Sequence, residues 1–168
     1  MNSSKLLSVL MLSAGVMLGA VHAQAEGTFS TKSLTPELAV TLAQATLEAC
    51  RAEGFQTAVA VVDKGGNLQA LIRDRFAGPH TPRTATLKAY TAVSFRANTT
   101  GLADNSQPGK EASGARDIPG ILMLGGGVLI ETGGELIGAV AVSGAPGGSF
   151  DEACAVKGLE AIADDLAF

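Results

Sequence analysis

Two segments of the chain are each predicted to form a pair of strands, and they constrain the fold more than any other feature. Segment 57–73 holds two runs of apolar and β-branched residues on either side of the turn 64–67 (Lys-Gly-Gly-Asn). Segment 128–143 holds two more such runs on either side of 133–134 (Gly-Gly). Short glycine-rich turns of this kind join neighbouring antiparallel strands. The sequence therefore predicts a mainly antiparallel sheet.

Three helices are expected from apolar residues at helical spacing. A Thr-Pro pair starts each of the first two, with the threonine as N-cap. The pair 35–36 starts a helix that ends at Gly54, and the pair 81–82 starts a helix that runs to about Arg96. Ser149 and a glutamate three residues later form a capping box that starts the last helix.

Two further segments complete the predicted order of elements. Residues 118–124 are apolar and are expected to form another strand, or a strand broken at Pro119. The polar stretch 97–120 is expected to be a functional loop or partly helical. The chain then reads helix, two strands, helix, long loop, about three strands, helix. This order predicts an α+β fold with a central, mainly antiparallel sheet of about five strands flanked by helices, and not a doubly wound parallel fold.

Residues 1–25 have the pattern of a secretory signal peptide. A lysine gives the positive start, an apolar segment follows over 6–18, and 23–25 (Ala-Gln-Ala) is a small-x-small cleavage site. The apolar segment is too short to span a membrane comfortably. We therefore expect export and cleavage before residue 26, with an uncleaved anchor as the alternative. The mature chain would be one domain over 26–168, periplasmic or secreted, with no membrane segment.

Charge and aromatic content argue against nucleic-acid binding. The chain has 12 Lys and Arg against 16 Asp and Glu, and loss of segment 1–25 removes one lysine, so the mature balance is 11 − 16 = −5. A negative protein is repelled by the phosphate backbone. The absence of Trp and the presence of a single Tyr leave few rings on which bases could stack.

Cys50 and Cys154 are the only cysteines, and two interpretations stay open. They could form one disulfide in an oxidising compartment if the first and last helices pack side by side. They could equally be two small buried residues. Their spacing fits neither a zinc site nor a redox pair.

Segment 73–96 carries the candidate functional groups. His80 would be the only histidine of the mature chain, and it lies just before the second helix, where the helix dipole disfavours imidazolium and leaves a neutral ring that can bind a metal. Four arginines lie in the same segment: Arg73, Arg75, Arg83 and Arg96. Guanidinium groups would pair with ligand carboxylates. The alternative is a surface or helix-capping histidine among solvated arginines.

Other motifs give little support for catalysis. The glycine runs 125–127 and 144–148 lack the features of a Walker loop and of a dinucleotide-binding turn. Tight turns and close backbone approaches explain these glycines better. The second run could still hold an anion, because it leads to a helix start. Ser143 lacks the leading glycine of a nucleophile elbow. One histidine cannot form the usual catalytic zinc site. General acid–base chemistry by His80 stays open, so an enzymatic role is undecided.

Six motifs, in order along the chain, carry a resemblance to a known family. They are Val-Ala-Val-Val-Asp-Lys-Gly-Gly-Asn-Leu (59–68), Arg-Asp-x-x-Ala-Gly-Pro-His-Thr (73–81), Lys-Ala-Tyr-Thr-Ala-Val-Ser-Phe (88–95), Gly-Gly-Gly-Val (125–128), Ile-Gly-Ala-Val-Ala-Val-Ser-Gly-Ala (137–145) and Asp-Glu-x-Cys-Ala-x-x-Gly-Leu (151–159). Over nearly all of its mature length the chain closely resembles the GlcG/HbpS-type haem-binding family. The resemblance implies a profilin-like layered fold, homo-oligomers with octamers among secreted members, and haem binding by some members.

The resemblance leads to one main hypothesis and two alternatives. The main hypothesis is an exported haem-binding protein for haem storage, delivery or sensing. His80 would be the axial iron ligand, since Tyr90 is one of few other usual ligands, and Arg75, Arg83 and Arg96 would face the propionates. We expect a shallow or intersubunit pocket. The alternatives are a small-carboxylate-binding or glycolate-related module without haem, which uses the same arginines, and a structural oligomer.

Overall fold

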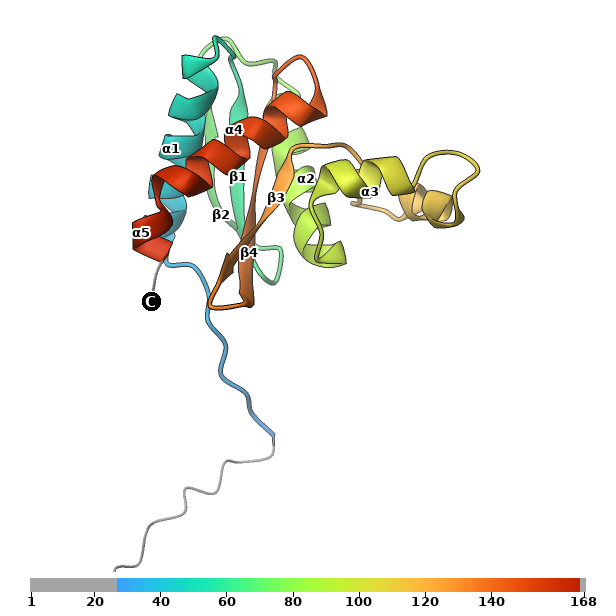
Figure 1. The fold of residues 1–168 in the computed structure, drawn as a ribbon, viewed down its shortest axis with the longest axis horizontal. Coiled ribbons are helices and arrows are strands. Elements are labelled where there is room, and N and C mark those ends of the chain that lie inside the picture. The colour runs from blue at the N-terminus through green and yellow to red at the C-terminus, as the bar shows by residue number, and fades with distance from the viewer. Residues whose placement is uncertain (1–26, 167–168) are drawn as a thin grey trace, which may run out of the picture. The chain divides into compact units, whose positions relative to one another are not determined.

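Four strands form the sheet at the centre of the fold (Figure 1). The structure is a computed structural model that describes residues 27–166. The strands are β1 (Ala58–Asp63), β2 (Leu68–Arg73), β3 (Gly127–Thr132) and β4 (Glu135–Ser143). Their order across the sheet is β2-β1-β4-β3, and every neighbouring pair is antiparallel. The predicted fold class is confirmed, and the predicted signal peptide over 1–25 lies outside the described residues.

Both predicted hairpins are present, with the predicted turns. In the β1–β2 turn, Asp63 Oδ1 accepts the backbone N–H of Gly65 at 2.8 Å and of Asn67 at 2.9 Å. In the β3–β4 turn, Gly133 and Gly134 have φ of +56° and +79°, a combination that glycine adopts without steric cost. Local turn chemistry therefore sets the strand pairing.

The prediction of a strand over 118–124 is wrong, and the sheet has four strands instead of about five. Ile118 begins a turn in which its carbonyl accepts the N–H of Ile121 at 3.1 Å. Pro119 and Gly120 occupy the central positions, and Gly120 has φ of +84°. Proline followed by a glycine with positive φ is typical of a type II turn, which reverses the chain and prevents a continuous strand here.

Helices account for most of the remaining described residues. They are α1 (Pro36–Ala52), α2 (Thr81–Phe95), α3 (Thr99–Asn105), the 3-10 helix η1 (Glu111–Asp117), α4 (Gly148–Ala161) and α5 (Ala163–Leu166). Segment 97–120 is thus partly helical, as predicted. None of the helices among residues 27–166 has the length and apolar character needed to cross a bilayer.

One of the three predicted helix caps is confirmed and two are displaced. Thr35 caps α1, since its side chain accepts the N–H of Leu38 at 3.2 Å. His80 is the N-cap residue of α2, and Thr81 is the first residue of the helix, with its hydroxyl donating to the carbonyl of Gly78 at 2.8 Å. Gly147 is the N-cap residue of α4, so Ser149 lies inside the helix and forms no capping box.

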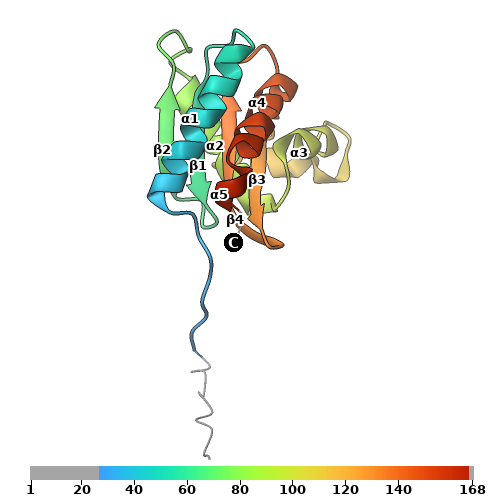
Figure 2. The same cartoon turned by 60° about the vertical axis from the view of Figure 1, so that its left-hand side comes forward.

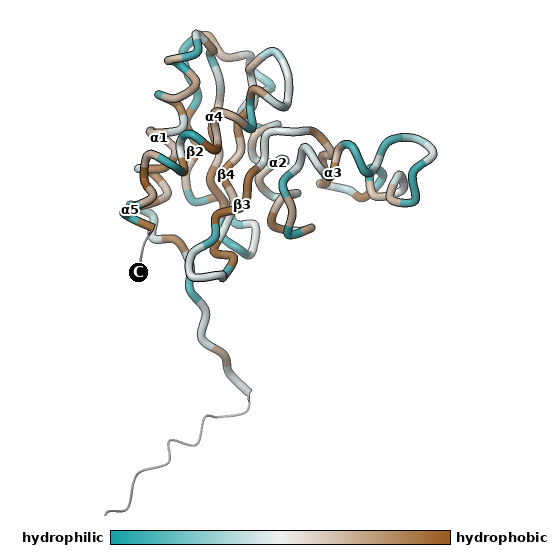
Figure 3. The backbone as a smooth tube through the Cα atoms, viewed as in Figure 1, coloured by the Kyte–Doolittle hydropathy of each residue, from teal (hydrophilic) through white to brown (hydrophobic). Residues whose placement is uncertain are grey.

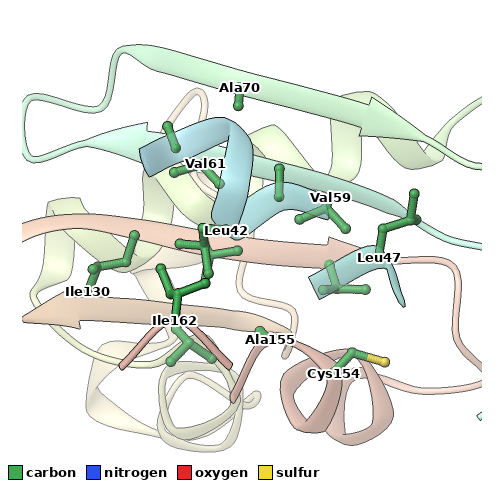
Figure 4. Close-up of a cluster of buried hydrophobic side chains, with 14 of the residues drawn as sticks. Leu42, Leu47, Val59, Val61, Ala70, Ile130, Cys154, Ala155 and Ile162 are labelled. Carbon is green, nitrogen blue, oxygen red and sulfur yellow. The ribbon is translucent and has the colours of Figure 1, made fainter. Parts of the chain in front are cut away.

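Helices cover both faces of the sheet. α1 and α4 lie side by side on one face, and α2 covers the other (Figure 2). Alternate residues of β1 pack on opposite faces of the sheet. Val59 and Val61 belong to the apolar cluster beneath α1 and α4, and Val62 belongs to the cluster beneath α2. Figure 4 shows the first cluster, with Leu42 of α1 over the sheet. Among the described residues, hydrophobic residues gather on the strands, whereas the segment beyond α3 is largely hydrophilic (Figure 3).

A disulfide between Cys50 and Cys154 joins α1 to α4, with a Cα–Cα distance of 5.2 Å. Of the two interpretations left open by the sequence, the structure contains the bonded one. The two helices also approach closely further along. A Cβ on Gly158 of α4 would lie 2.7 Å from Cα of Thr46 on α1, so only glycine fits at this crossing.

Gly158→Ala is predicted to lower the free energy of unfolding by about 1–3 kcal/mol, because the added methyl group overpacks the contact between α1 and α4. Gly101→Ala in α3 is the matched control: nothing lies within 4 Å of a Cβ there, and alanine favours a helix, so stability should stay unchanged or rise slightly. Urea denaturation of both variants measures the difference. An unchanged midpoint for Gly158→Ala would contradict the close crossing.

Candidate functional site

A cavity of about 470 Å³ lies where α2 begins, β4 ends and α4 begins. The first turns of α2 form one wall, and the glycine-rich loop 144–148 forms another. Leu122 and Leu124, from the segment before β3, add apolar surface. The volume falls within the range of about 300–1,000 Å³ that is usual for pockets that bind small molecules and cofactors.

His80 lines this cavity and is exposed at the start of α2. Its ring folds back over Gly78: a Cβ at that glycine would lie 2.8 Å from Cε1 and 2.9 Å from Nδ1 of the imidazole. Neither ring nitrogen has a hydrogen-bond partner in the part of the chain that the structure describes. The imidazole is therefore available to a ligand in the cavity.

Lys88 and Asp151 form a buried ion pair that also lines the cavity. The two side chains are among the most buried polar groups, with Lys88 1% and Asp151 4% exposed. Nζ of Lys88 donates to Oδ2 of Asp151 at 2.7 Å and to the carbonyl of Val142 at 3.0 Å. Oδ1 of Asp151 accepts the N–H of Ala145 at 3.0 Å. The pair thus ties α2 to α4 and fixes the loop between β4 and α4.

The glycine run 125–127 makes this ion pair sterically possible. A Cβ on Gly126 would lie 2.7 Å from Cβ of Asp151 and 2.9 Å from Nζ of Lys88. A Cβ on Gly127 would lie 2.7 Å from the backbone oxygen of Lys88. The sequence interpretation of this run as a close backbone approach is confirmed, and the partners of Gly126 and Gly127 include the two charged residues.

Burial raises the pKa of Asp151 above its ordinary value, even though the charge of Lys88 and the hydrogen bonds it accepts oppose this. Desolvation is the larger effect because the carboxylate lies away from water. Perturbed carboxyl groups beside a cavity are common at functional sites, which makes Asp151 a candidate functional residue.

A second ion pair anchors the loop that leads to His80. Arg51 of α1 holds Asp74 through two hydrogen bonds, Nε to Oδ2 at 2.7 Å and Nη2 to Oδ1 at 3.0 Å. These bonds lower the pKa of Asp74 to about 2. Asp74 also accepts the N–H of Arg75 at 2.8 Å, and Arg73 donates to the carbonyl of Ala77. Segment 73–77 is therefore fixed to α1, and His80 follows directly.

The structure does not bring the other predicted site residues to the cavity wall. Arg75, Arg83 and Arg96 are exposed, and none of the three lines the cavity. Tyr90 packs over the β1–β2 turn, where a Cβ on Gly66 would lie 2.6 Å from its ring. Because α2 has 15 residues, its rise of about 1.5 Å per residue separates Arg96 from His80 by roughly 20 Å within one chain.

Sequence analysis missed Lys88 and Asp151 as site residues, although both lie within the family motifs. A signal was available. Lys88 is three residues after Ala85 and four before Ala92, on the apolar face of the predicted helix, where a lysine needs a partner. Asp151 is likewise four residues before Ala155 on the apolar face of the last helix.

No group of three or more His, Cys, Asp or Glu side chains is placed to hold a metal ion within residues 27–166. A single imidazole can still serve as the axial ligand of a haem iron, because the porphyrin supplies the other four donors.

Comparison with known proteins identifies the family. A family model described as "Haem degrading protein HbpS-like" matches residues 34–160. The chain belongs to the HbpS-like family. A double mutant of HbpS from Streptomyces reticuli has a solved structure that is 36% identical, with a TM-score of 0.77 over 86% of this chain and 97% of that chain. The resemblance inferred from the six motifs is confirmed.

Two further solved structures share the HbpS-like fold. The PduOC:heme complex is 27% identical, with a TM-score of 0.71 over 78% of this chain and 96% of that chain. The ORFY protein of Klebsiella pneumoniae is 24% identical, with a TM-score of 0.78 over 84% of this chain and 98% of that chain, and supports the fold alone. A search of curated proteins gave no significant match.

Asp151→Ala is predicted to lower the free energy of unfolding by about 3–5 kcal/mol, because it leaves the buried charge of Lys88 without a partner. The double variant Lys88→Met/Asp151→Leu should recover most of this loss, since apolar side chains of similar volume replace both charges. Urea denaturation of the three proteins measures both effects. Equal losses in the single and the double variant would show that the uncompensated charge is not the cause.

Proposed function

We propose that this HbpS-like protein binds haem in the cavity between α2 and α4, with His80 as the axial iron ligand. The position of His80 carries the proposal: it lines the cavity, and its ring nitrogens have no hydrogen-bond partner among residues 27–166. Histidine is a common axial ligand of haem. The family description and the haem complex of PduOC support a haem-related function.

Part of the cavity wall is apolar, as the proposed binding of a porphyrin requires. Leu122, Leu124 and Pro146 offer apolar surface to the macrocycle, and Leu124 is 44% exposed, as expected for a shallow pocket. Loop 144–148 carries three glycines and therefore leaves room opposite α2. When bound, the haem would supply the iron chemistry, and the chain would supply the ligand, apolar contacts and orientation.

The exposed arginines are proposed to hold the propionates. Arg83 lies one helical turn beyond His80 and Arg75 lies in the loop that leads to it, so both can reach the edge of a haem bound at His80. Arg96 and Tyr90 lie much further along α2. In our proposal they contact a haem only where a second copy of the chain brings them to it.

A homo-oligomer, up to an octamer, is part of the proposal. β2 is an edge strand of the sheet, and it exposes Leu68 at 47% and Leu71 at 43%. Apolar side chains on an edge strand favour pairing with another chain. Light scattering on the purified mature protein gives the mass of the assembly. A monomer at all protein concentrations would contradict the proposed homo-oligomer.

Export to the periplasm or the medium is also proposed. The Cys50–Cys154 disulfide supports it, because structural disulfides form and persist in oxidising compartments. Expression of the full chain, followed by fractionation and N-terminal sequencing, tests the proposal. Recovery from the cytoplasm with residues 1–25 still attached would contradict it.

The decisive experiment is a haem titration of residues 26–168 followed by absorbance. We expect saturable binding with a shifted Soret band in the wild type, and loss of that shift in His80→Ala because the axial nitrogen is gone. Arg83→Ala should weaken binding, since it removes a charge partner for a propionate. Ascorbate is then added under air to the haem-loaded protein. Loss of the Soret band would show that the bound haem is also degraded, which is the activity that the family description names.

Lys110→Ala is the matched control for Arg83→Ala, because Lys110 is an exposed cation before η1, outside both α2 and the loop that leads to His80. It should bind haem like the wild type. A Soret shift that persists unchanged in His80→Ala would contradict the assignment of the ligand. Absence of saturable binding by the wild type would contradict haem binding itself.

A further inference from the structure

Lys88 differs from the other lysines that the structure describes. Lys32, Lys64, Lys110 and Lys157 are exposed, whereas Lys88 is 1% exposed and lines the cavity. A buried lysine needs a partner, and Asp151 provides it. Burial near a cavity is also the setting in which lysine amines become nucleophiles.

The ammonium group of Lys88 has a hydrogen-bond donor that the described part of the fold does not use. It carries three N–H donors, and two of them are taken by Asp151 and by the carbonyl of Val142. The third has no acceptor among residues 27–166. Because Lys88 lines the cavity, a ligand oxygen there can accept this bond.

We propose that Lys88 forms an imine with a small aldehyde or ketone that enters the cavity, with Asp151 as proton carrier and counterion. The ion pair on the floor of the cavity is the observation behind this proposal, which goes beyond haem binding and does not depend on it.

The step is balanced in atoms and charge. Asp151 first takes a proton from Nζ, which leaves a neutral amine and a carboxylic acid. The Nζ lone pair forms a bond to the carbonyl carbon as the C=O π bond breaks, and one proton moves from the nitrogen to the new alkoxide oxygen to give a neutral carbinolamine. Asp151 then returns the proton to the hydroxyl, the C–O bond breaks, water leaves, and a positively charged iminium remains beside the Asp151 carboxylate.

The charge balance favours a carbonyl ligand over an anion. The Lys88–Asp151 pair is neutral overall, so an anion would place a second negative charge beside a buried carboxylate. A carbonyl compound is neutral on entry, and the iminium keeps the single positive charge that the ammonium carried. The raised pKa of Asp151 makes its carboxylate a better proton acceptor within the pair.

Reductive trapping tests the proposal on the wild-type mature protein. The protein is incubated with acetaldehyde, or with acetone, and cyanoborohydride, which reduces an imine to a stable secondary amine. Peptide mass mapping then quantifies the label at each lysine. We expect several-fold more label on Lys88 than on the exposed Lys64 and Lys110. Label that follows solvent exposure, with little on Lys88, would overturn the proposal and leave the ion pair a structural role alone.

Three variants sharpen the result. Lys88→Arg keeps the positive charge but cannot form an imine, so the dominant label should disappear, whereas the matched Lys64→Arg should retain it. Asp151→Asn should reduce labelling of Lys88, and unchanged labelling would overturn the role of Asp151. The ratio of label on Lys88 to label on the exposed lysines is measured in the wild-type protein, so it decides the proposal even where a variant is destabilised.

Discussion

The buried ion pair between Lys88 and Asp151 holds the functional end of this fold together. α2 and α4 lie on opposite faces of the sheet, and the pair connects them past the end of β4. The carbonyl of Val142 and the N–H of Ala145 complete the hydrogen bonds of the two charges. Because each charge is buried, loss of one leaves the other uncompensated, and the cavity wall that both residues form depends on their remaining together.

This pair also explains where glycine is required. Gly126 and Gly127 pass so close to the ion pair that a side chain on Gly126 would collide with Asp151 and Lys88, and one on Gly127 with the backbone of Lys88. The first residue of α4 is also held close: a Cβ on Gly148 would lie 2.8 Å from Cα of Gly125. Part of the high glycine content, 21 residues, therefore follows from the packing of the cavity floor and not from flexibility.

The sequence predicted features that depend on near neighbours and missed those that depend on distant ones. The β1–β2 and β3–β4 hairpins and the Thr35 cap rest on contacts within a few residues, and they are present. The apolar segment 118–124 forms no strand, because the turn at Pro119-Gly120 outweighs its hydrophobicity. Lys88 and Asp151 are 63 residues apart, so no local pattern could pair them.

The arginines near His80 show the same limit. Proximity along the chain grouped Arg96 with His80, yet the whole of α2 lies between them. His80 itself was identified from its type and its place before a helix, and the structure places it on a cavity wall. Residue type and local position can thus single out one candidate side chain, whereas the residues that surround it come from elements joined only by folding.

The cavity between α2 and α4 is the central claim, because both haem binding and the chemistry of Lys88 are assigned to it. Anomalous diffraction at the iron edge, from crystals of residues 26–168 grown with haem, tests it most directly. We predict one strong iron peak per site within bonding distance of a His80 ring nitrogen, in the cavity lined by Lys88 and loop 144–148. An iron peak elsewhere on the protein, with His80 unligated, would contradict the account.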